Sequence, residues 1–476
     1  MDAQTSTRDA CATRISSLHS RVHFFRYRNR QLYCEDVDLA RVAEKFGTPL
    51  YVYSASTVLD HYRRLDVALA PLDHLICYAV KANSNRAILK LLAHEGAGFD
   101  IVSGGELYRV LAAGGDPARC TFAGVGKSRE EIEYALEQRV YSFNVESEAE
   151  LDYIDRIAGA KNLRAPIALR ANPDVDPHTH DYISTGSREN KFGIALNRIA
   201  GVYERAANMR NIDLIGVQMH IGSQITEAQP FADAIKKIAL IVRDLKSEYR
   251  IEFFSVGGGL GIVYESSFES GTKEWWDEWV ARDPATAGRP RTSALSIQQY
   301  VDAILPPLRE LKLRIFLEPG RLLVGNAGVL LTRVRYIKHT GEKKFAVVDA
   351  GMNDLIRPAL YGSYHQIVPA EEPSCSASVS GAKGKSKNLE KIDIVGPVCE
   401  SGDFFALDRE MPEVRKGDLI AIMSAGAYGF VMASNYNSRP LPAEVLVRGD
   451  KFALIRKRQA WQDLVCGEVE AKFSTE

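Results

Sequence analysis

Three short segments of the sequence carry groups that could do covalent or charge-based chemistry. Lys81 closes the apolar run LICYAVK, where burial would lower the pKa of its amine and favour the neutral nucleophile that forms a Schiff base. The glycines of residues 255–261 (SVGGGLG) can turn backbone N–H groups toward a phosphate. Residues 318–321 (EPGR) add the carboxylate of Glu318 and a guanidinium suited to phosphate or carboxylate. Each signal is weak alone, because a lysine after a strand is usually a solvated end and a glycine run is often only a tight turn.

Two further strand-like runs end in polar residues. His220 and Ser223 close the run GVQMHIGS, and Asp100 lies in GFDIVSGGE. An isolated histidine on an apolar strand is usually a satisfied core residue. At a strand end, however, the flat ring of His220 could stack on a cofactor, and the Ser223 hydroxyl could reach a phosphate.

A second set of polar residues lies late in the sequence. Cys399 and Glu400 fall in GPVCESGD, where the flanking glycines predict an exposed turn. A lone cysteine is more commonly a buried, inert thiol, but an adjacent carboxylate on a glycine-rich loop is poor core material. Arg357, Tyr361 and Tyr428 lie beside other turns of the same region, and each of them alone could be ordinary surface.

The elements that must position these groups alternate between short apolar runs and amphipathic, charge-rich stretches, the pattern of strands alternating with helices. The eight runs cover residues 75–81, 98–103, 121–125, 142–146, 167–172, 216–222, 253–259 and 315–320. Eight strands, each followed by helix-length sequence such as EEIEYALEQ, favour an α/β fold of the TIM (β/α)8 barrel type over a six-stranded open sheet. The carboxyl ends of barrel strands form one mouth, so the polar strand-end residues are expected to converge there, whereas an open sheet would spread them along a crevice.

The sequence after about residue 326 changes to short β-rich runs separated by turn residues, which predicts a second, all-β domain. These runs cover residues 329–336, 345–348, 392–395, 419–423 and 452–456. Residues 29–53 contain strand-like pieces of their own, so this domain is expected to draw on both ends of the chain. The predicted division is a barrel at residues 57–326 and a β domain made of residues 25–56 and 327–476.

Two stretches have the composition of insertions. Residues 374–388 (SCSASVSGAKGKSKN) are small, polar and basic, as in a surface loop. Residues 265–293 contain Trp275, Trp276 and Trp279, for which a short helix packing the indoles on the barrel is expected in preference to a partner site.

The composition of the chain excludes several classes of protein. Lys and Arg total 60 against 61 Asp and Glu, so no basic field would attract nucleic acid or an anionic membrane. The seven cysteines are scattered without a CxxC pair or zinc-ligand spacing, so neither a disulfide framework nor a metal site is expected. The first two dozen residues lack the apolar core of a secretion signal, and no later stretch is long enough to span a bilayer, which favours the cytoplasm by default.

Taken together, the motifs resemble those of the fold type III decarboxylases that use pyridoxal 5'-phosphate (PLP), and of the diaminopimelate decarboxylase family in particular. The resemblance runs from about residue 30 to 460. Its motifs are YAVKAN at 78–83, GFDIVSGGE at 98–106, KFG at 191–193, HIGSQ at 220–224, GGGLG at 257–261, EPGR at 318–321, CESGD at 399–403, GAYG at 426–429 and NYNSRP at 435–440. It implies an alanine-racemase-like combination of TIM barrel and β domain, and the decarboxylation of meso-2,6-diaminopimelate to L-lysine and carbon dioxide.

The resemblance also implies roles for single residues. Lys81 matches the lysine that binds PLP covalently, His220 the ring that stacks on it, and Glu318 the partner of its pyridine nitrogen. On the phosphate side the matching residues are Gly259, Gly320 and Arg321, and the predicted cofactor-binding set is completed by Asp100, Ser223 and Tyr428. Cys399 matches the proton donor, and the positions that match substrate contacts are Arg321, Arg357, Tyr361, Glu400 and Tyr428. In the family the Cys399 loop reaches into the barrel of a partner subunit, so a homodimer with shared active sites is implied.

The charges at these positions suit one substrate better than its rivals. meso-Diaminopimelate carries a second amine and a second carboxylate, which Glu400 on one side and Arg321 and Arg357 with Tyr361 on the other could bind. Ornithine and arginine have no such carboxylate and would leave Arg357 facing a cation. Carboxynorspermidine, which also has a second amine, is the harder alternative to separate. A catalytically inactive binding protein is the rival from another class, and the intact set of catalytic residues argues against it.

Overall fold

The computed structural model describes residues 22–175, 191–272, 275, 295–373 and 389–473. Contacts divide the chain into a barrel unit and a β unit. The barrel unit comprises Ala55–Ala327, the segment before Ala55 that ends at Phe24, and the short segment Gly426–Val431. The β unit comprises Phe25–Ser54, Gly328–Ala425 and Met432–Glu476. The expected insertion at 374–388 lies outside the described residues, as do Trp276 and Trp279.

Eight parallel strands of the barrel unit close on themselves. They are β5 (His74–Ala79), β6 (Gly98–Ile101), β7 (Cys120–Phe122), β8 (Ser142–Val145), β9 (Ala165–Asn172), β11 (Ile212–Gln218), β12 (Phe253–Ser255) and β13 (Arg314–Leu317). Each pairs with the next, and β13 pairs back with β5, while the short β10 (Ile194–Ala195) adds to β9 outside the ring. Each of the eight predicted runs overlaps one of these strands, so the predicted TIM barrel is confirmed.

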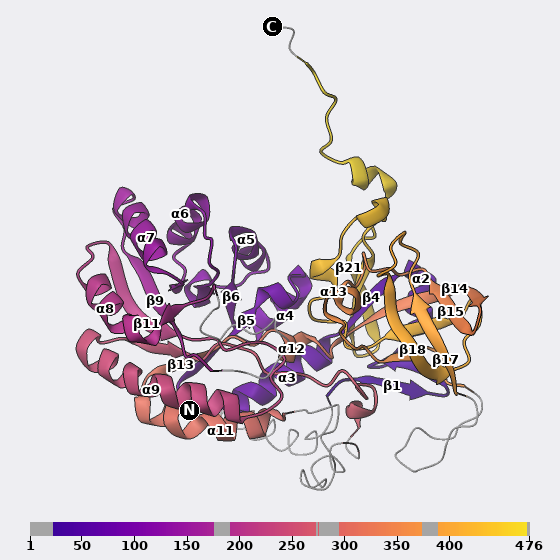
Figure 1. Cartoon of the computed structure of the whole chain (residues 1–476), viewed down its shortest axis with the longest axis horizontal. Coiled ribbons are helices and arrows are strands. Elements are labelled where there is room, and N and C mark those ends of the chain that lie inside the picture. The colour runs from indigo at the N-terminus through magenta and orange to yellow at the C-terminus, as the bar shows by residue number, and fades with distance from the viewer. Residues whose placement is uncertain (1–21, 176–190, 273–274, 276–294, 374–388, 474–476) are drawn as a thin grey trace, which may run out of the picture. The chain divides into compact units, whose positions relative to one another are not determined.

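Helices surround the barrel, as Figure 1 shows. They are α3 (Ala55–Ala68), α4 (Arg86–His94), α5 (Gly104–Ala112), α6 (Arg129–Gln138), α7 (Glu148–Ala160), α8 (Leu196–Ala207), α9 (Gln229–Tyr249) and α11 (Ile297–Leu311). Three of them begin at serine caps shortly after a strand end: the hydroxyls of Ser103, Ser128 and Ser147 each accept a hydrogen bond from a backbone N–H in the first helical turn. These caps satisfy otherwise unpaired N–H groups and fix where each strand-to-helix turn ends.

Aromatic packing fills the barrel near the amino ends of the strands. The ring centroids of Phe253 and Phe316 lie 4.6 Å apart, and Tyr141 packs on Phe316 at 4.9 Å. Gly216 is required beside them, because a Cβ atom there would lie 2.2 Å from the Phe253 ring. Phe253, Phe316 and Tyr141 thus form an aromatic plug near the amino ends of the strands, and the polar side chains of the barrel lie at the carboxyl ends.

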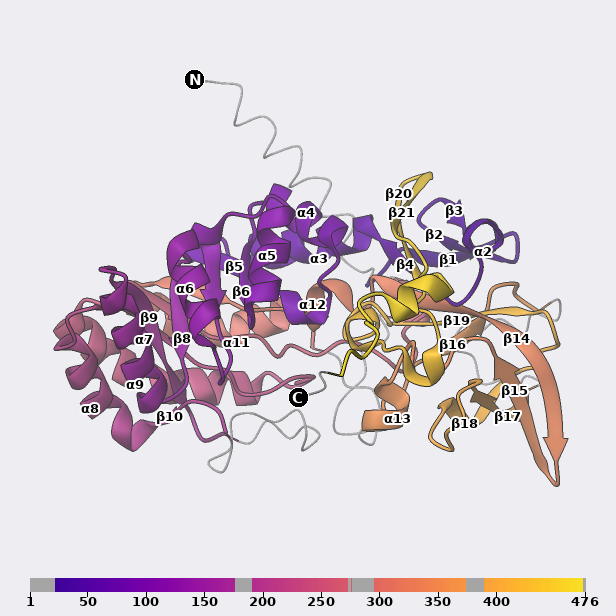
Figure 2. The same ribbon diagram turned by 90° about the horizontal axis from the view of Figure 1, so that it is seen from above.

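The β unit is a sheet built around a strand from the amino-terminal part of the chain. Its order is β18–β17–β15–β14–β4–β20–β21, with β19 (Leu419–Ile422) pairing both β14 and β16 (Ile367–Pro369). The strands are β4 (Leu50–Ser54), β14 (Gly328–Thr340), β15 (Lys343–Val348), β17 (Leu389–Val395), β18 (Phe404–Pro412), β20 (Ala443–Arg448) and β21 (Lys451–Arg456). β4 pairs antiparallel with β14 and parallel with β20. Figure 2 shows the long β14 beside β15 and β17.

Three shorter strands, β1 (Phe25–Arg28), β2 (Gln31–Cys34) and β3 (Val37–Asp38), form a separate sheet in this unit. The helices α2 (Leu39–Phe46) and α13 (Arg357–Tyr361) also belong to it. The predicted second domain rich in β-structure is therefore confirmed as a fold class, although it carries these short helices.

The segment Gly426–Val431 departs from the expected division, which assigned it to the β domain. It clusters with the barrel unit because Gly426 N donates to Gly325 O at 3.0 Å and Tyr428 N donates to Ala82 O at 2.8 Å. These long-range backbone hydrogen bonds carry Tyr428 to the carboxyl end of β5.

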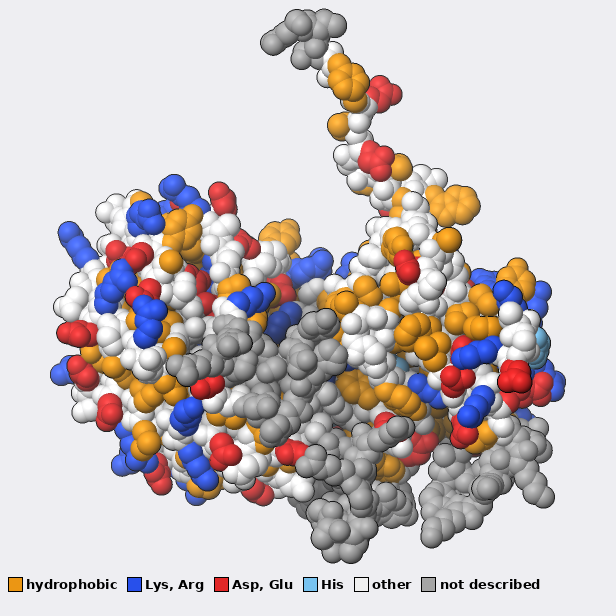
Figure 3. Space-filling model, viewed as in Figure 1, with side chains coloured by type: hydrophobic (Ala, Val, Ile, Leu, Met, Phe, Trp, Pro, Cys, Tyr) orange, Lys and Arg blue, Asp and Glu red, His pale blue; other side chains and the backbone are white. Residues whose placement is uncertain are grey.

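Charged side chains of both signs are interspersed over the face that Figure 3 shows, in keeping with a formal net charge of −1. Among the described helices, none is both long and apolar enough to cross a membrane. The five cysteines in the described part of the chain carry free thiols.

Lys127 ties the turn after β7 to the end of β8 from a buried position. Its ammonium donates to Gly124 O at 2.8 Å, to Asn144 O at 2.9 Å and to Glu150 Oε1 at 2.6 Å, and only 1% of its side chain is exposed. A buried charge that meets three acceptors is well satisfied, but removing it leaves the Glu150 carboxylate without its counter-ion.

We therefore expect Lys127→Met to lower the free energy of unfolding by about 3–5 kcal/mol, as measured by denaturant unfolding. Lys161→Met is the matched control, because Lys161 pairs with Glu133 and Glu137 at the surface with 31% of its side chain exposed. Its effect should be far smaller, since solvent screens exposed pairs. Equal losses in the two variants would contradict a structural role for the buried pair.

Candidate active site

Lys81 and Asp100 form an ion pair at the mouth of the barrel. Lys81 lies in a single 3₁₀ turn, η1 (Val80–Ala82), just beyond β5, and its Nζ is 2.9 Å from Asp100 Oδ2. Asp100 belongs to β6, the neighbour of β5, and its side chain is fully buried. Asp100 Oδ1 has no hydrogen-bond partner within the described residues. The pair therefore leaves one carboxylate oxygen for another group.

The protonation of Lys81 differs from the expectation. Burial lowers the pKa of its amine, but the Asp100 carboxylate, with Tyr428 and Glu318, outweighs that effect, and the pKa is raised. The side chain is 40% exposed, so solvent weakens the burial effect and the contact with Asp100 dominates. Without a bound carbonyl compound, Lys81 is an ammonium held by Asp100, and the predicted neutral amine is wrong for this state.

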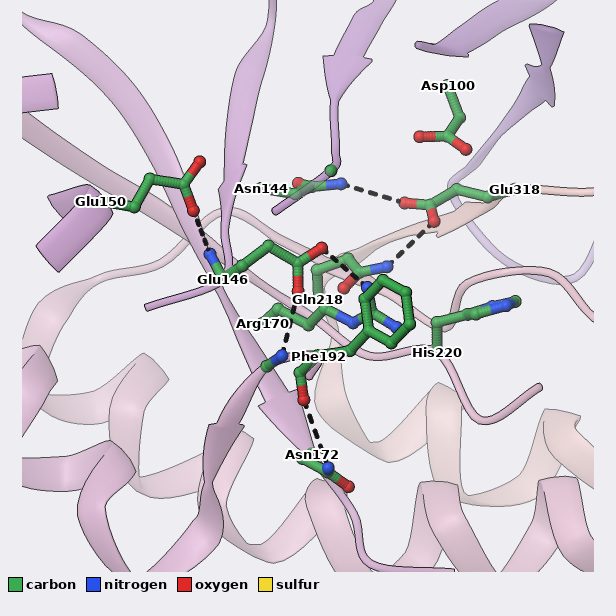
Figure 4. A network of polar contacts seen from close by, with 12 residues as sticks. Asp100, Asn144, Glu146, Glu150, Arg170, Asn172, Phe192, Gln218, His220 and Glu318 are labelled. Atoms are coloured by element: carbon green, nitrogen blue, oxygen red, sulfur yellow. Dashed lines mark hydrogen bonds and ion pairs between the residues drawn. The ribbon is translucent and has the colours of Figure 1, made fainter. Parts of the chain in front are cut away.

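Glu318, directly after β13, is surrounded by hydrogen-bond donors. Ser255 Oγ donates to Glu318 Oε1 at 2.7 Å, Asn144 Nδ2 to the same oxygen at 3.3 Å, and Gln218 Nε2 to Oε2 at 3.0 Å. The two amides point at the carboxylate in Figure 4, with Asp100 also in view. Glu318 is only 6% exposed. The pKa of Glu318 is raised to about 7, first by burial and then by the charge of Asp100.

The predicted glycine run packs against neighbouring backbone too closely for any side chain. A Cβ at Gly258 would lie 2.2 Å from Glu318 O, and one at Gly259, whose φ is +111°, would lie 2.4 Å from Gly222 O. Glycine is needed here for both the close approach and the backbone angle. Gly258 N also donates to His220 Nδ1 at 3.2 Å, so the loop orients the histidine ring.

His220 is half-buried after β11, and the pKa of its ring is lowered by burial and then by the charges of Arg170 and Lys81. Because Nδ1 accepts the Gly258 N–H, the proton of the neutral ring is assigned to Nε2. The site therefore presents a flat, uncharged ring in a fixed orientation.

Arg321, at the start of α12 (Arg321–Val324), adds a guanidinium to the mouth. Its guanidinium donates to Ser223 Oγ at 3.0 Å and to Tyr264 OH at 2.6 Å, and it lies 4.8 Å from the ring centroid of Tyr428. The structure thus brings Ser223, Arg321 and Tyr428 together. Gly320, next to Arg321, is buried where an added Cβ would be 3.0 Å from Ala82 Cβ.

Sequence reasoning missed several polar partners on the same strands. Glu146 and Arg170 form a buried ion pair of 2.7 Å, and Gly193 N of the KFG motif donates to the other oxygen of Glu146 at 3.0 Å. Figure 4 shows this pair beside Phe192, whose ring centroid is 4.8 Å from the Arg170 guanidinium carbon. A signal was present in the sequence, because Glu146 closes the predicted run 142–146, Arg170 lies within the run 167–172, and Gln218 lies two positions before His220, a spacing that places strand residues on one face.

Four predicted site residues lie in the β unit. Cys399 and Glu400 are exposed, as expected for a turn; Cys399 N donates to Asn437 Oδ1 at 2.8 Å, and Tyr436 OH donates to Glu400 Oε2 at 3.3 Å. Arg357 is buried and donates to Ser363 Oγ at 3.2 Å, with His365 Nε2 at 2.9 Å from its other terminal nitrogen. Tyr361 ends the same short helix, α13, and is half-buried.

The barrel mouth fits PLP, the cofactor that the resemblance implies. An amine suits its aldehyde carbon, a buried carboxylate its ring nitrogen, and an arginine with a hydroxyl its phosphate. Beyond Asp100 Oδ1, the buried side-chain oxygens Asn144 Oδ1 and Gln218 Oε1 have no hydrogen-bond partner in the described part of the chain. Lys81, Glu318, Arg321 and Ser223 would hold the cofactor, and the glycine loop leaves no side chain in its way.

Comparison with known proteins agrees with this site. Residues 55–325 match the family described as "Pyridoxal-dependent decarboxylase, pyridoxal binding domain". A diaminopimelate decarboxylase of Pseudomonas aeruginosa is 48% identical over 445 residues, which cover 93% of this chain and 98% of the relative. One from Aquifex aeolicus is 43% identical over 443 residues, covering 93% and 96%.

A solved structure of a diaminopimelate decarboxylase is also similar to this chain. The diaminopimelate decarboxylase of Helicobacter pylori, complexed with L-lysine, superposes with a TM-score of 0.78 at 39% identity, covering 90% of this chain and 98% of that one. With its barrel, its mouth and these relatives, the chain belongs to the pyridoxal-dependent decarboxylases and, within them, to the diaminopimelate decarboxylase family.

Proposed function

We propose that this chain decarboxylates meso-2,6-diaminopimelate to L-lysine and carbon dioxide with PLP as cofactor. One observation carries the chemistry: Lys81 and Glu318 follow β5 and β13, which are adjacent and parallel, with Leu317 in register with Ile76. The amine and the buried carboxylate therefore emerge at one edge of the barrel. The substrate follows from the family and from the L-lysine bound to the Helicobacter pylori relative.

When bound, PLP supplies an electron sink for the electron pair that remains as carbon dioxide leaves. The chain supplies alignment and charge. The amine of Lys81 would hold the cofactor, and the carboxylate of Glu318 would stabilise a positive charge on its ring nitrogen. His220 offers its neutral ring as a stacking surface. Arg321 and Ser223, with the backbone at Gly259 and Gly320, bind the phosphate, while Asp100 and Tyr428 complete the cofactor-binding set.

The β unit supplies the remaining groups in this proposal. Cys399 returns a proton to the carbon that has lost its carboxylate. Glu400 binds the distal ammonium of the substrate, and Arg357, with Tyr361, binds the distal carboxylate together with Arg321. The exposure of Cys399 and Glu400 supports a role in a site completed by a second copy of the chain. The working form is thus a homodimer with shared active sites.

The decisive experiment mixes purified protein and PLP with meso-diaminopimelate, ornithine, arginine and carboxynorspermidine in separate reactions and measures carbon dioxide. We expect release from meso-diaminopimelate alone, because only this substrate has both a distal ammonium and a distal carboxylate. Release from one of the others alone would overturn the assignment.

Cys399→Ala should bind PLP with an unchanged absorption spectrum but turn over about a hundredfold to ten-thousandfold more slowly, the usual contribution of a general acid. Cys466→Ala is the matched control, since Cys466 is another exposed free thiol. The control should keep full activity. Loss of the PLP spectrum in Cys399→Ala would show that Cys399 anchors the cofactor and does not act as the proton donor.

Two impaired variants should restore each other's activity if each site uses both chains. The two variants, Lys81→Ala and Cys399→Ala, are co-expressed on differently tagged chains. In each mixed dimer, one of the two sites then has both Lys81 and Cys399, and the other has neither. An unfractionated mixture should regain about a quarter of wild-type activity, because half of the dimers are mixed. Purified mixed dimers with no more activity than either parent would contradict a shared site.

A further inference from the structure

We infer that Asn144, Gln218 and Ser255 are positioning residues that keep Glu318 ionised and aimed into the barrel mouth, so that it can hold a protonated ring nitrogen. This inference rests on the proposed function but concerns atoms of the chain itself. The three residues come from different strands, β8, β11 and β12, and none was singled out by its sequence motif.

The three donors are buried, lie within hydrogen-bonding distance of Glu318, and between them contact both oxygens of its carboxylate. Ser255 and Asn144 meet Oε1, at 2.7 and 3.3 Å, and Gln218 meets Oε2 at 3.0 Å. Ser255 and Asn144 are fully buried, and Gln218 is 1% exposed. These contacts are therefore shielded from bulk water, and in such surroundings each hydrogen bond is electrostatically stronger than at the surface.

Each donor is oriented so that it donates to Glu318 and does not accept from it. Ser255 Oγ already accepts the Gly257 N–H at 3.3 Å, which directs its own proton to Glu318. The amide oxygens of Asn144 and Gln218 have no hydrogen-bond partner within the described residues. Turning either amide over would place its oxygen against a carboxylate oxygen, which is repulsive when Glu318 is charged. The arrangement thus matches an ionised Glu318, which accepts all three bonds, better than a protonated one.

The donors oppose strong forces in the other direction. Burial disfavours the charged carboxylate, and the negative charge of Asp100 also raises the pKa of Glu318. Lys81 is the cation that counters them, but Asp100 holds its ammonium at 2.9 Å. Because the resulting pKa of Glu318 is about 7, its ionised and protonated forms are similarly populated near pH 7. Losing one donor would leave Glu318 mostly protonated, and a neutral carboxylic acid binds a protonated nitrogen poorly.

The test uses the full-length chain with Ser255→Ala and, separately, Gln218→Met, which removes the donor at nearly constant volume. Ser142→Ala is the control: it is the same substitution at a fully buried serine of β8 whose hydroxyl has no hydrogen-bond partner in the described chain. Near-ultraviolet circular dichroism shows whether each variant keeps its packing.

The first measurement is the ionisation of Glu318 in cofactor-free protein, from the infrared band of its protonated carboxyl group after subtraction of Glu318→Gln. We expect each donor variant to raise the titration midpoint by about one to two pH units, the value of one hydrogen bond to a charged group. The Ser142→Ala midpoint should match wild type. An unchanged or lowered midpoint in both donor variants overturns the inference.

The second measurement compares the binding of PLP with that of its 1-deaza analogue, which has carbon in place of the ring nitrogen. The preference for PLP over the analogue should fall by about tenfold or more in the donor variants and stay unchanged in the control. An equal loss of affinity for both compounds would assign the residues a packing role alone and overturn the inference.

Failure of this inference is distinct from failure of the proposed function. If wild-type protein binds PLP and releases carbon dioxide from meso-diaminopimelate while the donor variants leave both measurements unchanged, only the role of the donors is wrong. If wild-type protein acts on none of the substrates, the function is wrong, and the titration of Glu318 still decides what the three donors do.

Discussion

Closure of the barrel is the constraint on which the site depends. Eight parallel strands bring their carboxyl ends to one mouth only if the ring is complete, which requires the β8–β9 and β13–β5 pairings in particular. Those pairings bring Asn144 to Glu318, although 174 residues separate them along the chain. The aromatic plug of Phe253, Phe316 and Tyr141 supports closure from the amino ends. The barrel thus combines aromatic packing at one end with polar side chains at the other.

The acidic side chains near the mouth are stabilised in different ways. Asp100 has a cation partner in Lys81, whereas Glu318 is met mainly by neutral donors. Glu106, at 2.8 Å from Val102 N, has a pKa raised to about 7 by burial. Arg321 is grouped with Ser223, Tyr264 and Tyr428. The carboxylates of Asp100 and Glu318 together with the guanidinium of Arg321 suit a ligand that is cationic at its ring and anionic at its phosphate.

Most of the fold follows from local pattern, because short apolar runs of strand length and the helices between them are coded within each segment. The local pattern also identifies Lys81, His220 and Glu318 as polar residues at strand ends, and therefore as candidates for the site. What local pattern does not contain is the pairing between distant segments. The raised pKa of Lys81 depends on the position of Asp100, 19 residues away, and the assignment of Gly426–Val431 depends on hydrogen bonds to residues 82 and 325. Ser255 and Gln218 become partners of Glu318 only when β11, β12 and β13 lie side by side.

The place of β4 in its sheet has a consequence for how the chain is made. Residues 50–54 lie between β14 and β20, so they pair with residues 328–331 and 443–447. During synthesis this apolar strand leaves the ribosome before the whole barrel sequence and waits for partners encoded hundreds of residues later. Pairings of such sequence separation form slowly, and an unpaired strand is a site of aggregation in the meantime. The eight barrel strands lie in one continuous stretch, residues 74–317, whereas the sheet of the β unit is completed only after residues 443–456 have been made.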